Sequence, residues 1–273
     1  MDPTASNFTK TVYHDTYAFV QNAKNSGHTV LITGASRGIG RSTAVSFAQN
    51  GAANIIIAAV SGPKPKILKL QLDVTSDSSV AAAAKAVKEK FGTIDVLINN
   101  AGFLTEWSSI ADANPKNWWK SWEVNVKGIF LVSHYFIPLI LAAPSESPKT
   151  IINISSVGAL FVGLGGFAYQ GSKTAVMRFT EFIAAEYAEQ EISAYCVHPG
   201  GVKTELADNA PEFIAESLID SPELAGDAMA LLAAEKRQWL NGRYMSVNWD
   251  LEGLFSRREE IVSEDKLKLR MTQ

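Results

Sequence analysis

Hydrophobic positions along the chain fall into two kinds of segment. Short runs such as Ile55–Val60 are apolar at every position, as expected of strands that are buried on both faces of a sheet. Longer segments such as Tyr169–Gln190 place apolar residues three and four positions apart, which is the spacing of one helix face. Strand and helix patterns alternate from Thr29 to Val247, which predicts an α/β fold: a single doubly wound parallel sheet with helices on both faces.

The predicted elements leave a segment at each end of the chain. We expect an N-terminal extension on the surface (residues 1–28), one central domain (residues 29–250) and a C-terminal tail (residues 251–273). Asn114 and Pro115 match an N-cap followed by proline at the first helical position. The predicted strands are Thr29–Thr33, Ile55–Val60, Ile67–Val74, Ile94–Asn99, Thr150–Ile154, Ile192–Val197 and Arg243–Val247. The predicted helices are one that ends near Gln49, Val80–Phe91, Pro115 to about Leu141, Tyr169–Gln190 and Pro222–Ala234.

The connection between the second and third predicted strands departs from this pattern. A parallel crossover takes a dozen or more residues and usually a helix, whereas Ser61–Lys66 is short and holds Pro63 and Pro65. Either this connection has lost its helix or the sequence lacks a segment.

Composition and charge narrow the classes of function. The chain has 273 residues, 47% of them hydrophobic, which is enough for one continuous core. Its net charge is −3 and it has no basic block, so we expect neither nucleic acid nor a membrane surface as a partner. The longest apolar run, Gly128–Ala143, falls short of the ~20 residues that cross a bilayer.

Cys196 is the only cysteine, so no intrachain disulfide can form, and its apolar neighbours predict a buried thiol. A single cysteine and the absence of an apolar signal core in residues 1–28 favour a reducing, cytoplasmic location. The four histidines lack metal-ligand spacing, and we predict no metal site.

A glycine-rich turn follows the first predicted strand and opens a helix. Gly34, Gly38 and Gly40 would allow a tight turn, a close approach of backbone to a pyrophosphate, and close packing of helix on strand. The N–H groups of the helix that follows would face an anion. This context predicts a dinucleotide site, although such a turn can also be purely structural.

Tyr169 and Lys173 lie four positions apart on the longest predicted helix of the second half. Residues at this spacing share a helix face, so the ammonium can lie beneath the phenol. A nearby cation favours phenolate, and we therefore expect the pKa of Tyr169 to fall toward neutrality, as proton exchange with an alcohol or carbonyl requires. The alternative is a surface tyrosine that happens to precede a lysine.

These motifs occur in one order along the chain. The order is Thr33-Gly34-Ala35-Ser36-Arg37-Gly38-Ile39-Gly40, Asn99-Asn100-Ala101-Gly102, Asn125, Ser155-Ser156, Tyr169 with Lys173, and Pro199-Gly200. Together they resemble the short-chain dehydrogenase/reductase family over about residues 29–250, and the extension and the Gly242-Arg243-Tyr244 ending resemble fungal members. The resemblance implies an NAD(P)(H)-dependent oxidoreductase that interconverts a carbonyl and an alcohol.

The resemblance also implies roles for single residues. Tyr169 would be the acid/base, and Lys173 would lower its pKa and hold the nicotinamide ribose. Ser156, thirteen residues before the tyrosine, would hydrogen-bond the substrate oxygen, with Ser155 as a strand-end neighbour. Asn125 would hold a water that links Lys173 to solvent; alternatively it is a buried asparagine satisfied by backbone.

The implied cofactor site draws on several loops. Asp73 would meet the adenine amino group, although an aspartate in this place is also a common turn former. Val202 and Thr204 would contact the nicotinamide amide. The implied cofactor-binding residues are Gly34, Ser36, Arg37, Gly38, Ile39, Gly40, Asp73, Val74, Asn100, Ala101, Gly102, Tyr169, Lys173, Pro199, Gly200, Val202 and Thr204.

Cofactor choice depends on the end of the second predicted strand. An acidic residue there would bind a ribose 2′-hydroxyl, whereas this chain has Ala59. Arg37 can reach a 2′-phosphate, or is simply a solvated loop charge. We therefore favour NADP(H), with NAD(H) possible.

The substrate is weakly encoded. Apolar residues precede Tyr169 and follow the Pro199-Gly200 motif, where the family has a mobile lid, and they suggest an apolar or aromatic ketone or alcohol. Core packing explains any one of them equally well. They are Leu160, Phe161, Leu164, Phe167, Phe213, Ile214, Leu218 and Ile219, with Trp107 as a further cleft candidate and Trp118 and Trp122 as helix packing.

The predicted function is reduction of a carbonyl by NADPH. We also expect a homodimer or homotetramer, because the predicted helices that begin after Asn114 and at Tyr169 resemble those that pair subunits in this family. One alternative is a non-catalytic cofactor-binding regulator or scaffold. Another is an isomerase or dehydratase, because a fold does not fix a reaction.

Overall fold

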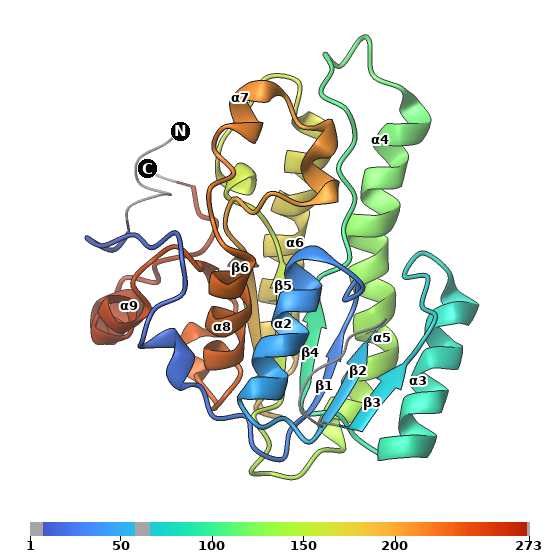
Figure 1. The fold of residues 1–273 in the computed structure, drawn as a ribbon, viewed down its shortest axis with the longest axis vertical. Helices are drawn as coiled ribbons and strands as arrows, with labels where there is room; N and C mark the ends of the chain where they lie inside the picture. Colours follow the sequence, from blue (N-terminus) through green and yellow to red (C-terminus); the bar gives the residue numbers. More distant parts are fainter. Residues whose placement is uncertain (1–7, 58–65, 272–273) are drawn as a thin grey trace.

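A parallel sheet forms the centre of the computed structural model, which describes residues 8–57 and 66–271 (Figure 1). Its seven strands run in the order β3-β2-β1-β4-β5-β6-β7, and every neighbouring pair is parallel. This confirms the predicted fold class. The strands are β1 (Thr29–Ile32), β2 (Asn54–Ile57), β3 (Lys66–Lys69), β4 (Val96–Asn99), β5 (Thr150–Ile154), β6 (Ser193–His198) and β7 (Tyr244–Ser246).

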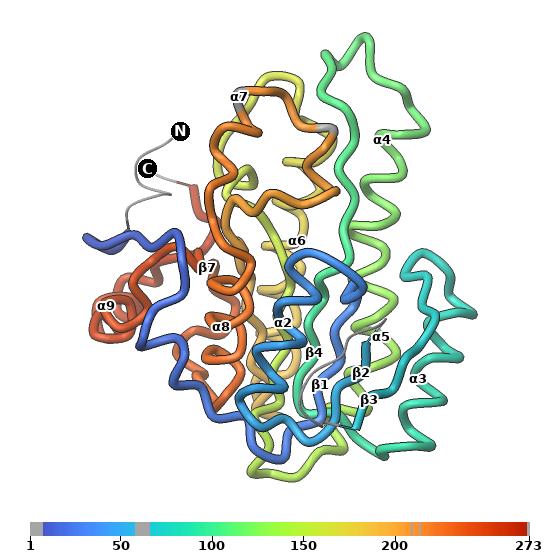
Figure 2. The backbone as a smooth tube through the Cα atoms, in the orientation of Figure 1, coloured from blue at the N-terminus to red at the C-terminus, as the bar shows by residue number. Residues whose placement is uncertain are grey.

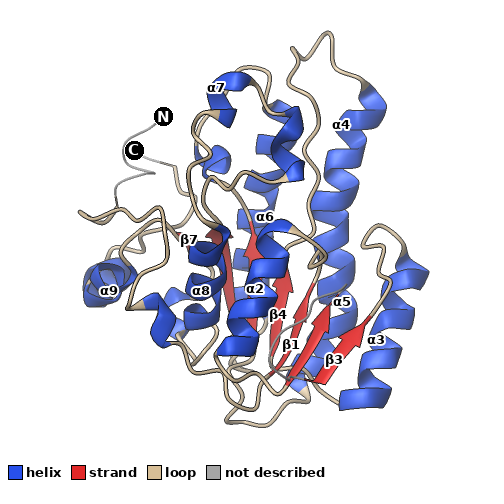
Figure 3. Ribbon diagram, viewed as in Figure 1, coloured by secondary structure: helices blue, strands red, loops and turns tan. Residues whose placement is uncertain are grey.

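Helices cover both faces of the sheet (Figure 3). In Figure 1, α2 and α8 lie on the near face, and α3, α5 and α6 lie on the far face. The α-helices are α2 (Gly38–Gln49), α3 (Asp77–Phe91), α4 (Pro115–Trp122), α5 (Gly128–Leu141), α6 (Phe167–Glu186), α7 (Glu212–Ala215), α8 (Pro222–Leu232), α9 (Leu251–Ser256) and α10 (Arg258–Ser263). Short 3₁₀ or π segments are η1 (Val20–Asn22), η2 (Glu123–Lys127), η3 (Val157–Leu160), η4 (Glu205–Asn209) and η5 (Gln238–Leu240).

Burial along the strands follows their place in the sheet. The central strands β1, β4, β5 and β6 are buried at every position, as their continuous apolar runs predict. The edge strand β3 instead exposes Lys66 and Lys69 at its two ends. Charged residues on an edge strand discourage pairing with a second sheet.

Polar caps fix where several helices begin. Ser76 accepts a hydrogen bond from Ser79 N, so α3 begins at Asp77, one turn before the predicted start. Asn114 Oδ1 accepts from Lys116 N at 2.9 Å, which confirms the predicted cap of α4. Hydrophobic periodicity marks the buried face of a helix, whereas the cap decides its first residue.

The third predicted strand is shorter than expected. Strand β3 ends at Lys69, and residues 70–74 form a loop that leads to α3. The Ser61–Lys66 connection, apart from Lys66 itself, lies outside the described residues, as does Ala59.

The long predicted helix from Pro115 to Leu141 is one helical run with a π segment, η2, in its middle. By length and mean hydropathy (1.6) this run is able to cross a membrane, but 56% of its apolar window is buried inside the protein. Its apolar side chains, among them Phe136 and Ile140, belong to the core on the far face of the sheet. We therefore read it as a core helix.

The N-terminal segment of the described chain lies beside the residues that follow β7 (Figure 2). Val12 pairs with Trp249 in an antiparallel bridge, and Tyr13 N donates to Asn248 O at 2.7 Å. Val20 is fully buried in the core that α2 and α8 share. The residues after Trp249 continue as the helices α9 and α10.

Candidate active site

The chain changes direction between β1 and β4. From β1 it moves outward to β2 and β3, and it then returns to β4 on the other side of β1. In open α/β sheets this switch point leaves a crevice at the carboxyl ends of the strands. The glycine-rich turn after β1 and the Asn99–Gly102 segment after β4 meet at this crevice.

Thr33 ties these two segments together. Its Oγ1 accepts hydrogen bonds from Asn100 N and Ala101 N, both at 3.0 Å. Asn100 Nδ2 donates in return to Thr33 O at 2.9 Å. The sequence motif contains Thr33, but only the structure shows that its hydroxyl joins both loops.

The first turn of α2 packs against the same loops. A Cβ at Gly40 would lie 2.4 Å from Asn100 Nδ2 and 2.6 Å from Gly34 O, so only glycine fits there. No side chain caps α2, and its first N–H groups are therefore available to an anion. A tight glycine turn before an uncapped helix fits the pyrophosphate of a dinucleotide.

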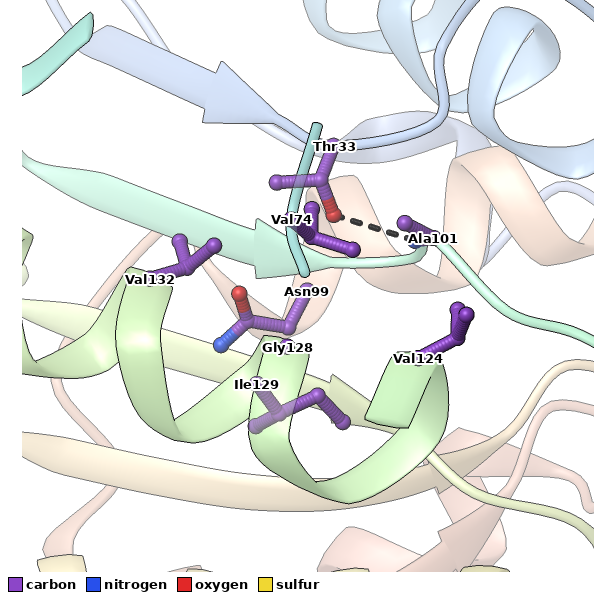
Figure 4. Close-up of a pocket in the computed structure, with 8 residues that line it drawn as sticks. All are labelled: Thr33, Val74, Asn99, Ala101, Val124, Gly128, Ile129 and Val132. Atoms are coloured by element: carbon purple, nitrogen blue, oxygen red, sulfur yellow. Dashed lines mark hydrogen bonds between the residues drawn. The ribbon is translucent and has the colours of Figure 1, made fainter. Parts of the chain in front are cut away.

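A small depression lies beside the Thr33 hydroxyl (Figure 4). Val74 and Ala101, both predicted to line the cofactor, border it, and Val124 and Gly128 come to it from the far-face helix run. Sequence reasoning missed Val124, although its position next to Asn125 was a usable signal. Asp73, next to Val74, is exposed and accepts hydrogen bonds from Thr75 N and Oγ1 at 2.9 and 2.8 Å. These bonds hold the pKa of Asp73 below its usual value, and they show the turn-forming role; the adenine contact stays a prediction.

Ser156, Tyr169 and Lys173 converge at the carboxyl end of β5. Ser156 precedes η3, and its Oγ accepts from Gly158 N at 3.1 Å. Its hydroxyl acts on the Tyr169 phenol and lowers the pKa of that phenol. Lys173 Nζ lies 5.6 Å from the centre of the Tyr169 ring and donates to Ile154 O at 2.8 Å. Helical spacing thus brings Lys173 beside the tyrosine, but the ammonium is hydrogen-bonded to the strand backbone.

The predicted fall in the pKa of Tyr169 is wrong. Burial raises the pKa of Tyr169 to about 12, and the hydrogen bond with Ser156 opposes this only in part. Burial also lowers the pKa of Lys173 to about 8. Desolvation acts against both charged forms, and at this site it outweighs the attraction of the cation for the phenolate.

Ser155 and Asn125 hold the segments that carry the site residues in place through hydrogen bonds. Ser155 Oγ donates to Lys173 O at 2.9 Å, so it fixes α6 to the sheet, as a strand-end neighbour would. Asn125 is buried in η2, and its amide accepts from Phe103 N at 2.8 Å and donates to Phe103 O at 2.9 Å and Ser172 Oγ at 3.0 Å. This is the backbone-satisfied alternative, and it positions the segment after Gly102; the water link to Lys173 stays a prediction.

The segment after β6 reaches the glycine-rich turn. Gly201 N donates to the Asp220 carboxylate, and Val202 pairs with Asp220 in a bridge. The Thr204 methyl carbon lies 3.0 Å from the place of a Gly38 Cβ. Sequence reasoning missed Asp220, because nothing in its local pattern shows that it is the partner of a loop some twenty residues earlier.

The residues predicted to contact the substrate include both exposed and packed side chains. Leu164 and Ile219 are 92% and 63% exposed, whereas Leu160 packs against the core. Trp107 lies on the backbone just before α6: a Cβ at Gly166 would meet its ring at 2.5 Å. Trp118 and Trp122 pack on each other at 5.9 Å, as predicted, and the side chain of Phe213 lies outside the described residues.

The doubly wound sheet, the anion-ready turn at its switch point and the Ser156, Tyr169 and Lys173 cluster define a nucleotide-dependent oxidoreductase. Residues 28–214 match the family model described as short chain dehydrogenase, and the chain belongs to that family.

Relatives of this chain extend over nearly its whole length. It is 43% identical to a short chain dehydrogenase of Monascus purpureus, over 98% of both chains, and 38% identical to one of Emericella variicolor, over 97% of this chain and 96% of that one. The first alignment spans 290 positions, more than the 273 residues of this chain, so that relative carries residues with no counterpart here. Among solved structures, a 3-ketoacyl-(acyl-carrier-protein) reductase from Brucella melitensis, complexed with NADH, is similar (TM-score 0.75, 26% identity, 82% of this chain and 98% of that one). An L-sorbose reductase from Gluconobacter frateurii, complexed with NADPH and L-sorbose, is also similar (TM-score 0.71, 25% identity, 82% and 96%).

Proposed function

We propose that this oxidoreductase reduces the carbonyl of an apolar small molecule to an alcohol, with NADPH as its cofactor. The observation that carries the proposal is the Ser156, Tyr169 and Lys173 cluster beside the dinucleotide crevice. A phenol with a pKa near 12 stays protonated at neutral pH, so Tyr169 is ready to act as an acid, which is the role that reduction needs.

A nicotinamide cofactor, when bound, supplies the hydride. The residues of this chain handle the oxygen. Ser156 Oγ donates a hydrogen bond to the carbonyl oxygen and stabilises the charge that develops there, and the Tyr169 hydroxyl gives its proton to the same atom. Lys173, held by Ile154 O at 2.8 Å, lies near the Gly102 backbone, where it would bind the ribose.

The proposed preference for NADP(H) depends on Arg37. It is the N-cap residue of α2, and its guanidinium is 68% exposed at the rim of the crevice. A guanidinium there suits a 2′-phosphate. The similar structures support both choices, since one holds NADH and another NADPH, and NAD(H) stays possible for this chain.

The proposed substrate is an apolar or aromatic ketone. Trp107 packs against the loop that precedes α6, Phe161 and Leu164 lie in that loop, and Leu164 and Ile219 are mostly exposed. Large apolar side chains left in solvent next to a candidate site suit an apolar ligand.

We further propose a cytoplasmic homodimer or homotetramer. The exposed aromatic side chains of α5 and α6 support the assembly: Phe130 and Phe182 are 48% and 57% exposed, and Phe130 packs edge-on against Phe179. The single cysteine supports the location.

Replacement of Tyr169 tests the function. Tyr169→Phe keeps the ring but removes the proton, so we expect an intact fold, unchanged binding of NADPH and a loss of turnover by ~10²–10⁴-fold. The measurement is NADPH oxidation with a panel of aromatic and aliphatic ketones, with cofactor titration in parallel. Activity within a few-fold of wild type would remove Tyr169 from the mechanism. If the wild-type protein binds NADPH but no ketone of the panel supports its oxidation, the non-catalytic, isomerase or dehydratase alternatives would be favoured.

A further inference from the structure

Residues 201–220, which we call the lid, rise above the carboxyl ends of the strands through η4 and α7 (Figure 1). The two ends of the lid are joined to each other, because Asp220 N donates to Gly201 O at 3.0 Å and Gly201 N donates to the Asp220 carboxylate. The other carboxylate oxygen of Asp220 lies 2.6 Å from His14 Nδ1. The base of the lid is therefore fixed to the N-terminal segment and to the end of β6.

The leading edge of the lid touches the glycine-rich turn. The Thr204 methyl carbon packs at Gly38, and the Glu205 carboxylate forms an ion pair with the Arg37 guanidinium. Arg37 is 68% exposed and Glu205 63% exposed. The lid is thus held to the cofactor turn through the residue proposed to bind a 2′-phosphate.

A carboxylate and a phosphate use a guanidinium in the same way. Each accepts a pair of hydrogen bonds from the planar N–H groups of the guanidinium, so one arginine can bind only one of them in this way at a time. A carboxylate next to the guanidinium also repels an incoming phosphate. Because exposed ion pairs are weak, a phosphate can displace Glu205 from Arg37.

We propose that Glu205 determines cofactor specificity: its carboxylate competes with the 2′-phosphate of the cofactor for Arg37, and phosphate binding releases the leading edge of the lid. The inference rests on the NADP(H) preference proposed above. It makes the strength of that preference a property of the lid as well as of the glycine-rich turn.

Two nucleotide fragments isolate the phosphate. Adenosine 2′,5′-bisphosphate and AMP differ only in the 2′-phosphate, and calorimetric titration of the full chain measures both. We expect Glu205→Gln to tighten the bisphosphate by about two- to fivefold, the range that loss of an exposed ion pair allows, with AMP unchanged. In an Arg37→Ala background the same substitution should have a smaller effect. Glu212→Gln is the matched control, since Glu212 lies in the lid and forms no ion pair within the described ranges.

The release of the lid has its own readout. Amide hydrogen exchange of residues 204–210 should become faster when the bisphosphate binds, and should not when AMP binds. Equal tightening of both nucleotides by Glu205→Gln, no tightening at all, or exchange that does not respond to the bisphosphate would each overturn the inference. If the wild-type protein does not prefer the bisphosphate to AMP but the Glu205→Gln variant does, the NADP(H) proposal is overturned and the inference about Glu205 stands.

Discussion

At the scale of single residues, burial decides the protonation of the proposed catalytic pair. Tyr169 and Lys173 are both removed from water, so the phenol keeps its proton up to about pH 12 and the ammonium loses its proton near pH 8. Their spacing along one helix made the pair predictable from sequence. Their protonation was not predictable, because it depends on the neighbours that fold around them.

Lys173 gives a prediction for stability. Its pKa falls from 10.5 in the unfolded chain to about 8 in the fold, so between these values the unfolded state holds more protons and stability rises with pH. Below pH 8 the full cost of burying the ammonium is present, on the order of 3 kcal/mol at ~1.4 kcal/mol per pKa unit. Lys173→Met removes this cost, and its unfolding free energy relative to wild type should fall by about that amount between pH 7 and 10.5.

Denaturant unfolding at several pH values measures this difference. Lys127→Met is the control for loss of a lysine at an exposed position. The lost hydrogen bond to Ile154 O offsets part of the gain at all pH values, so the slope, not the level, is the signal. A flat difference for Lys173→Met would show that the ammonium is hydrated in solution.

Other site residues were beyond sequence reasoning. Glu205 and Asp220 act on Arg37 and Gly201 through the folded lid, and a local pattern carries no sign of such partners. Thr33 lies inside the glycine motif, but the two N–H groups that its hydroxyl binds come from a segment after β4. What could be predicted were the residues whose neighbours lie within one turn or one helix.

At the scale of elements, periodicity located the strands and the long helices, whereas it missed the short helices α7, α9 and α10, and caps and loops set the ends of the elements. Strand β5 matches its predicted range, whereas β3 stops at Lys69 because residues 70–74 turn toward the start of α3. The π segment in the long helix run could not be predicted, since its apolar spacing resembles that of an ordinary helix. Asn125 lies in that segment.

Two helical glycines test how closely α2 must approach the crevice. A Cβ at Gly40 would meet Gly34 O at 2.6 Å, so Gly40→Ala should destabilise the protein by about 1–3 kcal/mol and weaken cofactor binding at least tenfold. Gly171 in α6 is the matched control, because its Cβ would meet only Trp122, at 3.8 Å. Gly171→Ala should leave stability unchanged or raise it by up to about 1 kcal/mol, since alanine favours helix. Thermal unfolding and NADPH titration of both variants give the comparison, and equal behaviour would contradict the packing argument.

At the scale of the whole molecule, the sheet joins segments that are far apart in the chain. The N-terminal segment reaches the lid through His14 and the residues after β7 through Val12. The sequence predicted the sheet and its two covered faces, because they follow from alternating patterns. It did not predict these contacts, because they join segments that are far apart in the sequence and meet only when the helices have packed on the sheet.

The exposed aromatic side chains of α5 and α6 lead to a prediction about assembly. If these helices pair two subunits, Phe182→Glu places a charge in the interface and should give a monomer in sedimentation experiments. Ile110→Glu is the control, because Ile110 is 79% exposed on a loop before α4. A wild-type protein that sediments as a monomer, or a Phe182→Glu variant that keeps the wild-type size, would refute this interface.

Cys196 lies in β6, next to the edge strand β7, and its reactivity reports on opening of this part of the sheet. It is the only thiol of the chain, it is 1% exposed, and burial raises its pKa to about 12. Only the thiolate reacts readily, so a thiol reagent can modify Cys196 only when local opening of this strand exposes it to solvent. The labelling rate of the native protein therefore reports how often the sheet beneath Lys173 opens, and no mutation is needed to introduce a thiol. A cofactor that bridges the loops above Cys196 should lower the labelling rate.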